Sequence, residues 1–373
     1  MIIENQLIVY VVLALLAAMA VSFLMSPLVK SFAYKVGAID VPKDARRMHK
    51  VPVPRLGGLA IFIGFMVSIL LFVNITAEMK SILLGAVIIV VLGVVDDIMA
   101  LPAMLKFVVQ IVAATIPAMG GVRILAFSNP NIFSDELYWV LGNLSVPLTV
   151  LWIVAITNAV NLIDGLDGLA NGVSAISATT VLLIALMGNQ VQVAMVMAAL
   201  VGACVGFMPY NLNPAKMFMG DTGATFLGYI LATMSIQGLF KFYAVISFAV
   251  PFLILGLPIF DTAFAFIRRI AHGQNPMHAD RSHIHHRLID MGLNQKQAVA
   301  CLYVISAILG LSAVVLTTGG EQRAMLFFGA MCVVAVVAAR VVFPKEVKEE
   351  LLEELHEITE HGHHPEEKKD EES

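Results

Sequence analysis

The chain has 373 residues, of which 59% are hydrophobic and 13% are charged, and its mean hydropathy is +0.87. Soluble globular domains are about 45–50% apolar and about a quarter charged, so this composition excludes a chain built of ordinary water-soluble domains. The formal net charge of −4 is set by an acidic C-terminal tail and says nothing about partners. We expect a single all-α domain that crosses a membrane several times.

Eleven apolar segments are long enough to cross a bilayer, which takes about 20 residues and at least about 17. In chain order they cover residues 6–25, 57–74, 80–97, 103–120, 144–161, 173–189, 190–208, 222–239, 242–260, 298–317 and 324–343. The first segment follows Glu4 and not a basic stretch, so we expect a retained helix and no cleavable signal peptide. Only Gly188-Asn189-Gln190 separates the sixth segment from the seventh.

The basic residues assign a side to each connecting loop. With the N-terminus outside, 19 of the 23 lysines and arginines lie on the cytoplasmic side, as the positive-inside rule requires. All ten histidines and every aspartate except Asp135 fall on that same side. An odd number of spans then places the C-terminus in the cytoplasm. We expect one membrane domain over residues 1–343 and an acidic, histidine-containing cytoplasmic tail over residues 344–373.

Polar residues gather in five segments on the predicted cytoplasmic side. The first is the basic, proline-rich loop 40–58, which contains His49 and would also suit contact with anionic lipid headgroups. The second is Asp96-Asp97 at the inner end of the third span, followed by Lys106. Adjacent carboxylates at a membrane boundary are costly unless they are solvated, paired or bound to a metal, which makes this pair a functional candidate.

The third segment, residues 158–172, combines amides, acids and glycines directly after a span. It reads NAVNLIDGLDGLANG and contains Asn158, Asn161, Asp164 and Asp167. Carboxylate and amide oxygens are the ligands that hard divalent cations prefer. The glycines would let backbone amides approach a phosphate closely.

The fourth segment, residues 211–223, leads into the eighth span and contains Lys216 and Asp221. Its Gly-Asp-Thr-Gly turn beside a lysine suits a phosphate and metal cradle. Asp221 and Thr222 also stand where a helix begins, so either one would serve as an ordinary N-cap.

The fifth segment is a histidine-rich loop, residues 278–287. His283, His285 and His286 lie between Arg281 and Arg287. Clustered histidines either ligate a transition metal or bind phosphate oxygens. The two arginines favour phosphate, because cationic side chains oppose the binding of a metal cation and attract an anion.

Together the five segments bring aspartate, asparagine, lysine, arginine and histidine to one face of a membrane domain. Phosphoryl transfer uses this set of side chains, because Mg²⁺ and cationic groups offset the phosphate charge while the reactants are aligned. A site at this face would let a lipid phosphate meet a water-soluble nucleotide.

The chain resembles the polyprenyl-phosphate N-acetylhexosamine-1-phosphate transferase superfamily in five ordered motifs. These are DVPKDARRMHKVPVPRLGG (40–58), DDIMALPAMLK (96–106), NAVNLIDGLDGLANG (158–172), NPAKMFMGDTG (213–223) and DRSHIHHRL (280–288). The first loop and the histidine motif look like the WecA/TagO-like branch, which uses UDP-N-acetylglucosamine (UDP-GlcNAc) and undecaprenyl phosphate. The phospho-MurNAc-pentapeptide transferase branch typically carries different versions of both.

The resemblance implies that the lipid phosphate attacks the sugar-linked phosphorus of UDP-GlcNAc, giving undecaprenyl-diphosphate-GlcNAc and UMP. By motif position, Asp221 is the leading Mg²⁺ ligand with Asn161 as its partner, and Mn²⁺ is an alternative ion. The implied catalytic candidates are Asp96, Asp97, Lys106, Asp164, Asp167, His283, His285 and His286. The implied substrate-binding candidates are His49, Asn158, Asn161, Lys216, Arg281 and Arg287.

The resemblance also implies a location and partners. We expect a multi-pass protein of the bacterial cytoplasmic membrane that binds UDP-GlcNAc, undecaprenyl phosphate and membrane lipid, and no nucleic acid. A homodimer stays open, as does the glycan begun on the lipid, for example teichoic acid or O-antigen. One alternative is a transferase of another UDP-N-acetylhexosamine. The other is an ion transporter, although a transporter should carry polar residues at mid-span and internal repeats, and we find neither.

Overall fold

The computed structural model describes residues 2–42, 51–128, 138–240, 249–271 and 283–342. Its helices are α1 (Ile2–Val36), α2 (Gly58–Phe72), α3 (Ala77–Met99), α4 (Ala103–Met119), α5 (Ser145–Leu162), α6 (Leu169–Met187), α7 (Val191–Asn211), α8 (Gly220–Ser235), α9 (Ala249–Ile254), α10 (Gly256–Ala271), α11 (Ile284–Asp290) and α12 (Gln295–Val342). A 3₁₀ turn at Gly142–Leu144 precedes α5, and a π-helical turn at Ile236–Phe240 extends α8.

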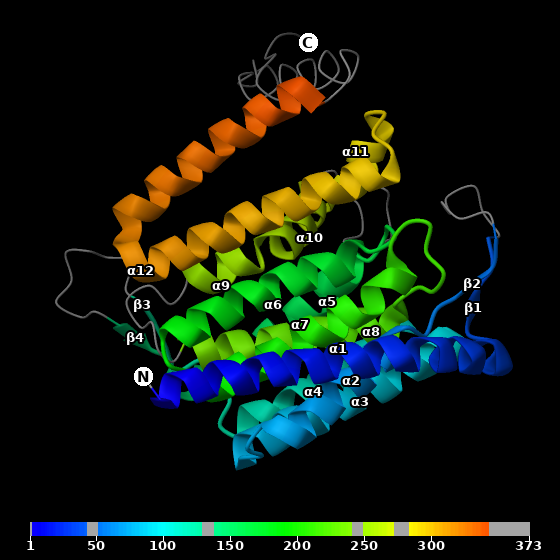
Figure 1. The fold of residues 1–373 in the computed structure, drawn as a ribbon, viewed down its shortest axis with the longest axis horizontal. Coiled ribbons are helices and arrows are strands. Elements are labelled where there is room, and N and C mark those ends of the chain that lie inside the picture. Colours follow the sequence, from blue (N-terminus) through cyan, green and yellow to red (C-terminus); the bar gives the residue numbers. More distant parts are fainter. Residues whose placement is uncertain (1, 43–50, 129–137, 241–248, 272–282, 343–373) are drawn as a thin grey trace, which may run out of the picture.

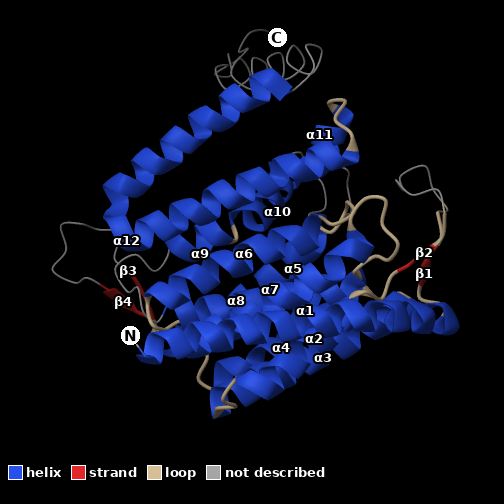
Figure 2. Ribbon diagram, in the orientation of Figure 1, coloured by secondary structure: helices blue, strands red, loops and turns tan. Residues whose placement is uncertain are grey.

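Strands are confined to two short antiparallel hairpins (Figure 2). The strands β1 (Ile39–Asp40) and β2 (Val53–Pro54) pair across the first loop. The strands β3 (Ala126–Ser128) and β4 (Tyr138–Val140) pair between α4 and α5. The all-α prediction therefore holds for the described part of the chain, apart from these hairpins.

Each predicted span overlaps a helix in the described part of the chain, with three corrections, and the total of eleven spans stays a prediction. Among the described residues, six helices are long and apolar enough to cross a membrane, and three more apolar helices are shorter. The first helix runs on to Val36, well past the predicted end at residue 25. The predicted ninth span, 242–260, is wrong as a single helix, because α9 ends at Ile254 and α10 starts at Gly256.

The third correction concerns the last two predicted spans, 298–317 and 324–343. They belong to one continuous helix, α12, which Figure 1 shows as two arms joined by a bend. The uncertain boundary at Gly188-Asn189-Gln190 is a real one, since α6 and α7 are separate helices that pack against each other.

The helix α8 forms the centre of the bundle. Every residue from Thr222 to Ser235 is buried, and α8 packs against α2, α3, α5 and α6. The outer helices α1, α3 and α4 carry many exposed large apolar side chains, among them Leu24, Leu84 and Val112. A water-soluble monomer rarely exposes apolar patches of this extent, so lipid must cover these faces.

The polar segments lie at one end of the bundle. In Figure 1 the β1–β2 hairpin and α11 lie at the right-hand end, and the N-terminus and the β3–β4 hairpin lie at the left-hand end. Glycines allow the helices to meet closely at the right-hand end. A Cβ atom at Gly58 of α2 would collide with the backbone of Gly223, and one at Gly93 of α3 with the backbone of Thr222. The first turn of α8 is therefore held directly against α2 and α3.

Candidate active site

Asp97 of α3 caps the N-terminus of α8. One carboxylate oxygen, Oδ1, accepts the backbone N–H of Asp221 at 3.0 Å. The other, Oδ2, accepts the backbone N–H of Thr222 at 3.0 Å and its hydroxyl at 2.6 Å. Arg55 closes the arrangement by donating to the backbone carbonyl of Asp97. The first N–H groups of a helix lack partners within the helix, and here a neighbouring helix supplies them.

This cap leaves the carboxylate of Asp221 available for other contacts. The residue before α8, Met219, makes no side-chain cap, and Asp221 lies in the first turn. The reading of Asp221 or Thr222 as an N-cap is therefore wrong, because Asp97 performs that task from α3. Asp97, predicted as a catalytic group, is 2% exposed and already accepts three hydrogen bonds, so it is poorly placed to act as a base.

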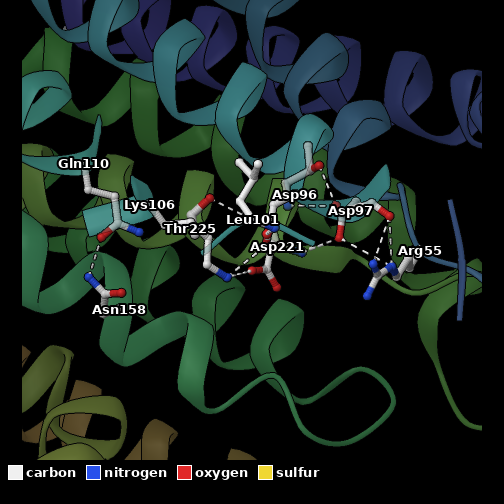
Figure 3. A network of polar contacts seen from close by, with 10 residues as sticks. Arg55, Asp96, Asp97, Leu101, Lys106, Gln110, Asn158, Asp221 and Thr225 are labelled. Carbon is white, nitrogen blue, oxygen red and sulfur yellow. Dashed lines mark hydrogen bonds and ion pairs between the residues drawn. The ribbon is translucent and has the colours of Figure 1, made fainter. Parts of the chain in front are cut away.

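Lys106 of α4 joins two carboxylates that come from different helices. Its Nζ lies 2.9 Å from Oδ2 of Asp96 and 3.1 Å from Oδ2 of Asp221 (Figure 3). The other oxygen of Asp96 accepts the backbone N–H of Leu101 at 2.7 Å. The side chain of Asp221 is 32% exposed, whereas that of Asp96 is 8% exposed. Asp221 is thus the carboxylate of this pair that a ligand can reach.

One turn further along α4, an amide pair continues the polar line. The side chain of Asn158 on α5 donates to Oε1 of Gln110 at 2.6 Å and to the backbone carbonyl of Val154 at 2.8 Å (Figure 3). Gln110 is only 3% exposed. The predicted substrate-binding Asn158 is therefore hydrogen-bonded to α4 at Gln110, one helical turn from Lys106.

The loop between α5 and α6 brings two more acids to this end. Asp167 braces the loop before α8, since its Oδ2 accepts the side-chain amide of Asn213 at 2.9 Å and the backbone N–H of Ala215 at 3.0 Å. Asp164 is half-buried. Burial, together with the negative charges of Asp221, Asp97 and Asp167, raises the pKa of Asp164 to about 8. Asp167 orders the loop, and Asp164 is a carboxyl group that holds its proton up to about pH 8 in the absence of a cation.

The histidine segment contacts both α10 and the acidic loop. Nδ1 of His283 lies 3.0 Å from Oδ2 of Asp261, and the rings of His283 and His285 stack with centroids 5.8 Å apart. A Cβ atom on Gly165 would collide with Nε2 of His285, so these histidines lie against the loop that carries Asp164. Burial, and then the neighbouring His286, lower the pKa of His285 to about 4.

This neutral state changes the prediction for His285. It is 3% exposed, and its Nε2 has no hydrogen-bond partner within the described structure. An imidazole that stays neutral at physiological pH cannot hold a phosphate as a cation, but it can hydrogen-bond to one. His286 packs against His285 with ring centroids 4.3 Å apart, and Arg287 lies over the ring of Phe264.

Other predicted site residues lie apart from these contacts or outside the described structure. Lys216 is exposed, and Asn161 is half-buried with no side-chain hydrogen bond among the described residues. Their roles stay predictions. His49 and Arg281 lie outside the described residues.

Sequence reasoning missed Asp261, Gln110 and Arg55. Asp261 has a visible signal, because an acid inside the apolar stretch of α10 is costly and marks a functional candidate. Gln110 carries no such signal, and the first-loop motif that contains Arg55 does not reveal its partner. The roles of both residues depend on distant parts of the sequence, Asn158 and Asp97.

The donor set suits Mg²⁺ better than a transition metal. Among the described residues, no three acidic, histidine or cysteine side chains converge into a complete metal site. Mg²⁺ does not need one, because it is usually held by one or two carboxylates together with waters and substrate phosphates. Asp221, Asp96 and Asp164 provide carboxyl oxygens in one region of the structure. Lys106 contacts two of these groups, Asp96 and Asp221.

The fold and the site define a multi-pass membrane protein with a carboxylate-rich site at one end of its helical bundle. A family model, glycosyl transferase family 4, matches residues 79–239, which carry Asp96, Lys106, Asp164 and Asp221. A probable undecaprenyl-phosphate N-acetylglucosaminyl 1-phosphate transferase of Bacillus subtilis is 43% identical over 84% of this chain and 86% of its own length.

Two other relatives are more distant. A decaprenyl-phosphate N-acetylglucosaminephosphotransferase of Mycolicibacterium smegmatis is 30% identical over 86% of each chain. A phospho-N-acetylmuramoyl-pentapeptide-transferase of Heliobacterium modesticaldum is 35% identical, but over only 52% of this chain and 63% of its own length. The chain belongs to glycosyl transferase family 4, among the polyprenyl-phosphate N-acetylhexosamine-1-phosphate transferases, and it is a transferase.

Proposed function

We propose that the protein transfers GlcNAc-1-phosphate from UDP-GlcNAc to undecaprenyl phosphate at the cytoplasmic face of a bacterial membrane. The observation that carries the proposal is the pair of carboxylates, Asp96 and Asp221, joined by Lys106 at the polar end of a lipid-facing bundle. The relatives that match most of the chain act, by their names, on a polyprenyl phosphate and N-acetylglucosamine phosphate. The product would begin a cell-surface glycan.

The bond changes of the proposed reaction balance without an added reactant. An oxygen of the lipid phosphate bonds to the sugar-linked phosphorus, the bond from that phosphorus to the bridging oxygen breaks, and UMP leaves with that oxygen. A general base is unnecessary, because a phosphate monoester with a second pKa near about 6 is already largely ionised at neutral pH. This fits a site in which Asp97 is occupied by the α8 cap.

Several side chains would together offset the negative charges of the nucleotide diphosphate and the lipid phosphate, about two on each. Asp221, with Asn161, would hold Mg²⁺, which when bound would offset charge on the nucleotide diphosphate. Lys106 would place its ammonium near the reacting phosphates while keeping Asp96 and Asp221 together. The histidine segment, pressed against Gly165, would hydrogen-bond the phosphate from the other side of the loop.

The test is transfer by the purified protein in detergent. The protein would be incubated with UDP-GlcNAc labelled in the sugar, undecaprenyl phosphate and Mg²⁺, and the label that enters the lipid phase would be compared with the UMP formed. We expect equal amounts of both, loss of both on chelation, and partial recovery with Mn²⁺. Label transferred only from UDP-MurNAc-pentapeptide would assign the chain to the other branch, and no lipid product from either donor would refute the proposal.

A matched variant separates the site from the fold. Glu78 lies in the first turn of α3, at the opposite end from Asp96, and accepts a hydrogen bond from Gln237. Glu78→Gln removes one carboxylate charge from the same helix, and we expect it to retain most of the transfer activity.

A further inference from the structure

Asp261 is an acid placed inside an apolar helix with both of its oxygens engaged. It lies on α10, is 3% exposed, and has Oδ1 bound to the backbone N–H of Ile284 at 2.7 Å. Its other oxygen, Oδ2, lies 3.0 Å from Nδ1 of His283. One carboxylate therefore binds the first residue of α11 and the ring of the residue before it.

The contact fixes the proton on the His283 ring. An ionised carboxylate only accepts hydrogen bonds, so Nδ1 of His283 must carry the proton that it shares with Asp261. Nε2 is then the nitrogen left for a ligand. His283 is 7% exposed, so its ring has little room to turn and present the other nitrogen.

The His283 ring contacts the acidic loop indirectly, through the ring of His285. The ring of His283 lies nearly parallel to that of His285, with an interplanar angle of 5°. His285 in turn contacts Gly165, where only a residue without a Cβ atom fits. A displaced His283 ring would thus disturb the His285 ring and its contact with the loop that carries Asp164.

We propose that Asp261 is a positioning residue for the transfer reaction, which acts by holding His283 in the Nδ1-protonated tautomer and His285 against Gly165. The inference rests on the proposed function for its effect on activity, but the tautomer itself is a property of the ligand-free protein. The competing explanation is purely structural, with Asp261 serving only to tie α11 to α10.

Asp261→Asn separates the two explanations. The amide can keep its oxygen on the N–H of Ile284, which preserves the tie to α11. Its NH₂ group then faces Nδ1 of His283 and can only donate, so the proton of His283 must move to Nε2. We expect the tautomer to reverse while the midpoint of thermal unfolding changes little. The kcat for transfer should fall by about 10–100-fold, the usual cost of losing a partner that orients a functional histidine, with a smaller change in KM.

Nitrogen NMR of protein labelled with ¹⁵N-histidine reads the tautomer directly. The His283 signals would be assigned by their loss in His283→Gln. At a pH alkaline enough for the ring to be neutral, the wild-type protein should show a protonated Nδ1 and an unprotonated Nε2, and Asp261→Asn the reverse. A wild-type His283 protonated on Nε2 alone would overturn the proposal, whether or not the variant folds and whether or not the transferase assay succeeds.

Double substitution and a nearby control complete the test. If Asp261 acts through His283, Asp261→Asn should cost little further activity in a His283→Gln background. An equal cost in both backgrounds would support the structural explanation and overturn ours. Ser177→Ala is the matched control, because it removes a buried 2.8 Å hydrogen bond between α6 and the end of α9 without touching His283. We expect this control to leave both the tautomer and kcat unchanged.

Discussion

Lys106 forms ion pairs with two carboxylates of the candidate site. Its ammonium binds Asp96 and Asp221 at about equal distances, 2.9 and 3.1 Å. With Asp164 close enough to interact electrostatically with Asp221, one cation faces three carboxylates. Ionising all three is unfavourable in a half-buried site, so burial and the neighbouring acids raise the pKa of Asp164, and a divalent cation would allow it to ionise.

Asp221→Asn should abolish turnover and leave the fold intact. A neutral amide is a poorer Mg²⁺ ligand than a carboxylate, and Asp221 is the reachable member of the Lys106 pair. We expect transfer activity to fall by about 100-fold or more, as when a preorganised charge contact is removed from a transition state. Stabilisation by added Mg²⁺ in thermal unfolding should weaken as well. Activity like that of the wild type at saturating Mg²⁺ would remove Asp221 from the metal site.

The raised pKa of Asp164 predicts how the stability of the protein depends on pH. Its pKa is about 8 in the folded protein and near the ordinary value of 3.8 in the unfolded chain. The folded state therefore keeps a proton that the unfolded state has released, so the stability that this group contributes is present below about pH 4 and is lost as the pH rises toward 8.

Asp164→Asn should remove that loss. In the metal-free protein, the variant should unfold at a higher temperature than the wild type at pH 8.5, and the difference should shrink as the pH is lowered toward 5. Asp290→Asn, on an exposed residue at the end of α11, is the control and should show no such trend. A difference in unfolding temperature that does not change with pH would show that Asp164 is ionised in the folded protein throughout this range.

At the scale of elements, α3 positions α8, and neighbouring residues of α3 have different tasks. Successive residues of an α-helix point about 100° apart. Asp96 therefore faces Lys106 on α4, while Asp97 faces the N-terminus of α8. The sequence shows only two adjacent acids, and nothing in that pair says which one belongs to the fold.

Asp97→Ala should destabilise the protein more than Asp96→Ala. It leaves the N–H groups of Asp221 and Thr222 and the hydroxyl of Thr222 without a partner inside a closely packed region. We expect a loss of about 3 kcal/mol, the usual scale for breaking a buried polar arrangement by removing one partner. Thermal or denaturant unfolding in detergent measures it. If Asp97→Ala kept its stability but lost its activity, Asp97 would act in catalysis and not mainly as the cap of α8.

The same elements show what could be predicted from the sequence and what could not. Apolar runs of sufficient length gave the spans, because hydrophobic length is a local property. The broken ninth span was missed, since the apolar composition continues through it. The continuity of α12 was missed for the opposite reason, because the polar stretch between residues 317 and 324 predicts a break where the helix runs on. The motif acids could be found from their cost near a membrane, and so could Asp261. The Asp97 cap could not, because it joins residues 124 and 125 positions apart.

The molecule as a whole places its polar contacts at one end of a lipid-covered bundle. Contacts link four of the five motif segments there: Arg55 to Asp97, Lys106 to Asp221, and Asp167 to Asn213. Gly165 then links the acidic loop to the histidine segment. The proposed chemistry requires this end to face the cytosol, where a nucleotide sugar would be available, and the basic residues favour that orientation.

Cysteine labelling tests this orientation at positions that the structure shows to be exposed. The native cysteines, Cys204, Cys301 and Cys332, would first be replaced, and single cysteines would then be placed at Asn189, Lys216 and Asp290. Asn189 lies in the turn between α6 and α7, at the opposite end of α6 from the acidic loop, whereas Lys216 lies in the loop before α8 and Asp290 ends α11. An impermeant maleimide applied to intact cells should label Asn189→Cys only, and permeabilised cells should show labelling at all three.

Because α6 and α7 are separate antiparallel helices, the loops before and after them must share one side of the membrane. Labelling of Lys216→Cys or Asp290→Cys from outside would place the carboxylate site away from the cytosol, and a cytosolic nucleotide sugar could not then be its substrate.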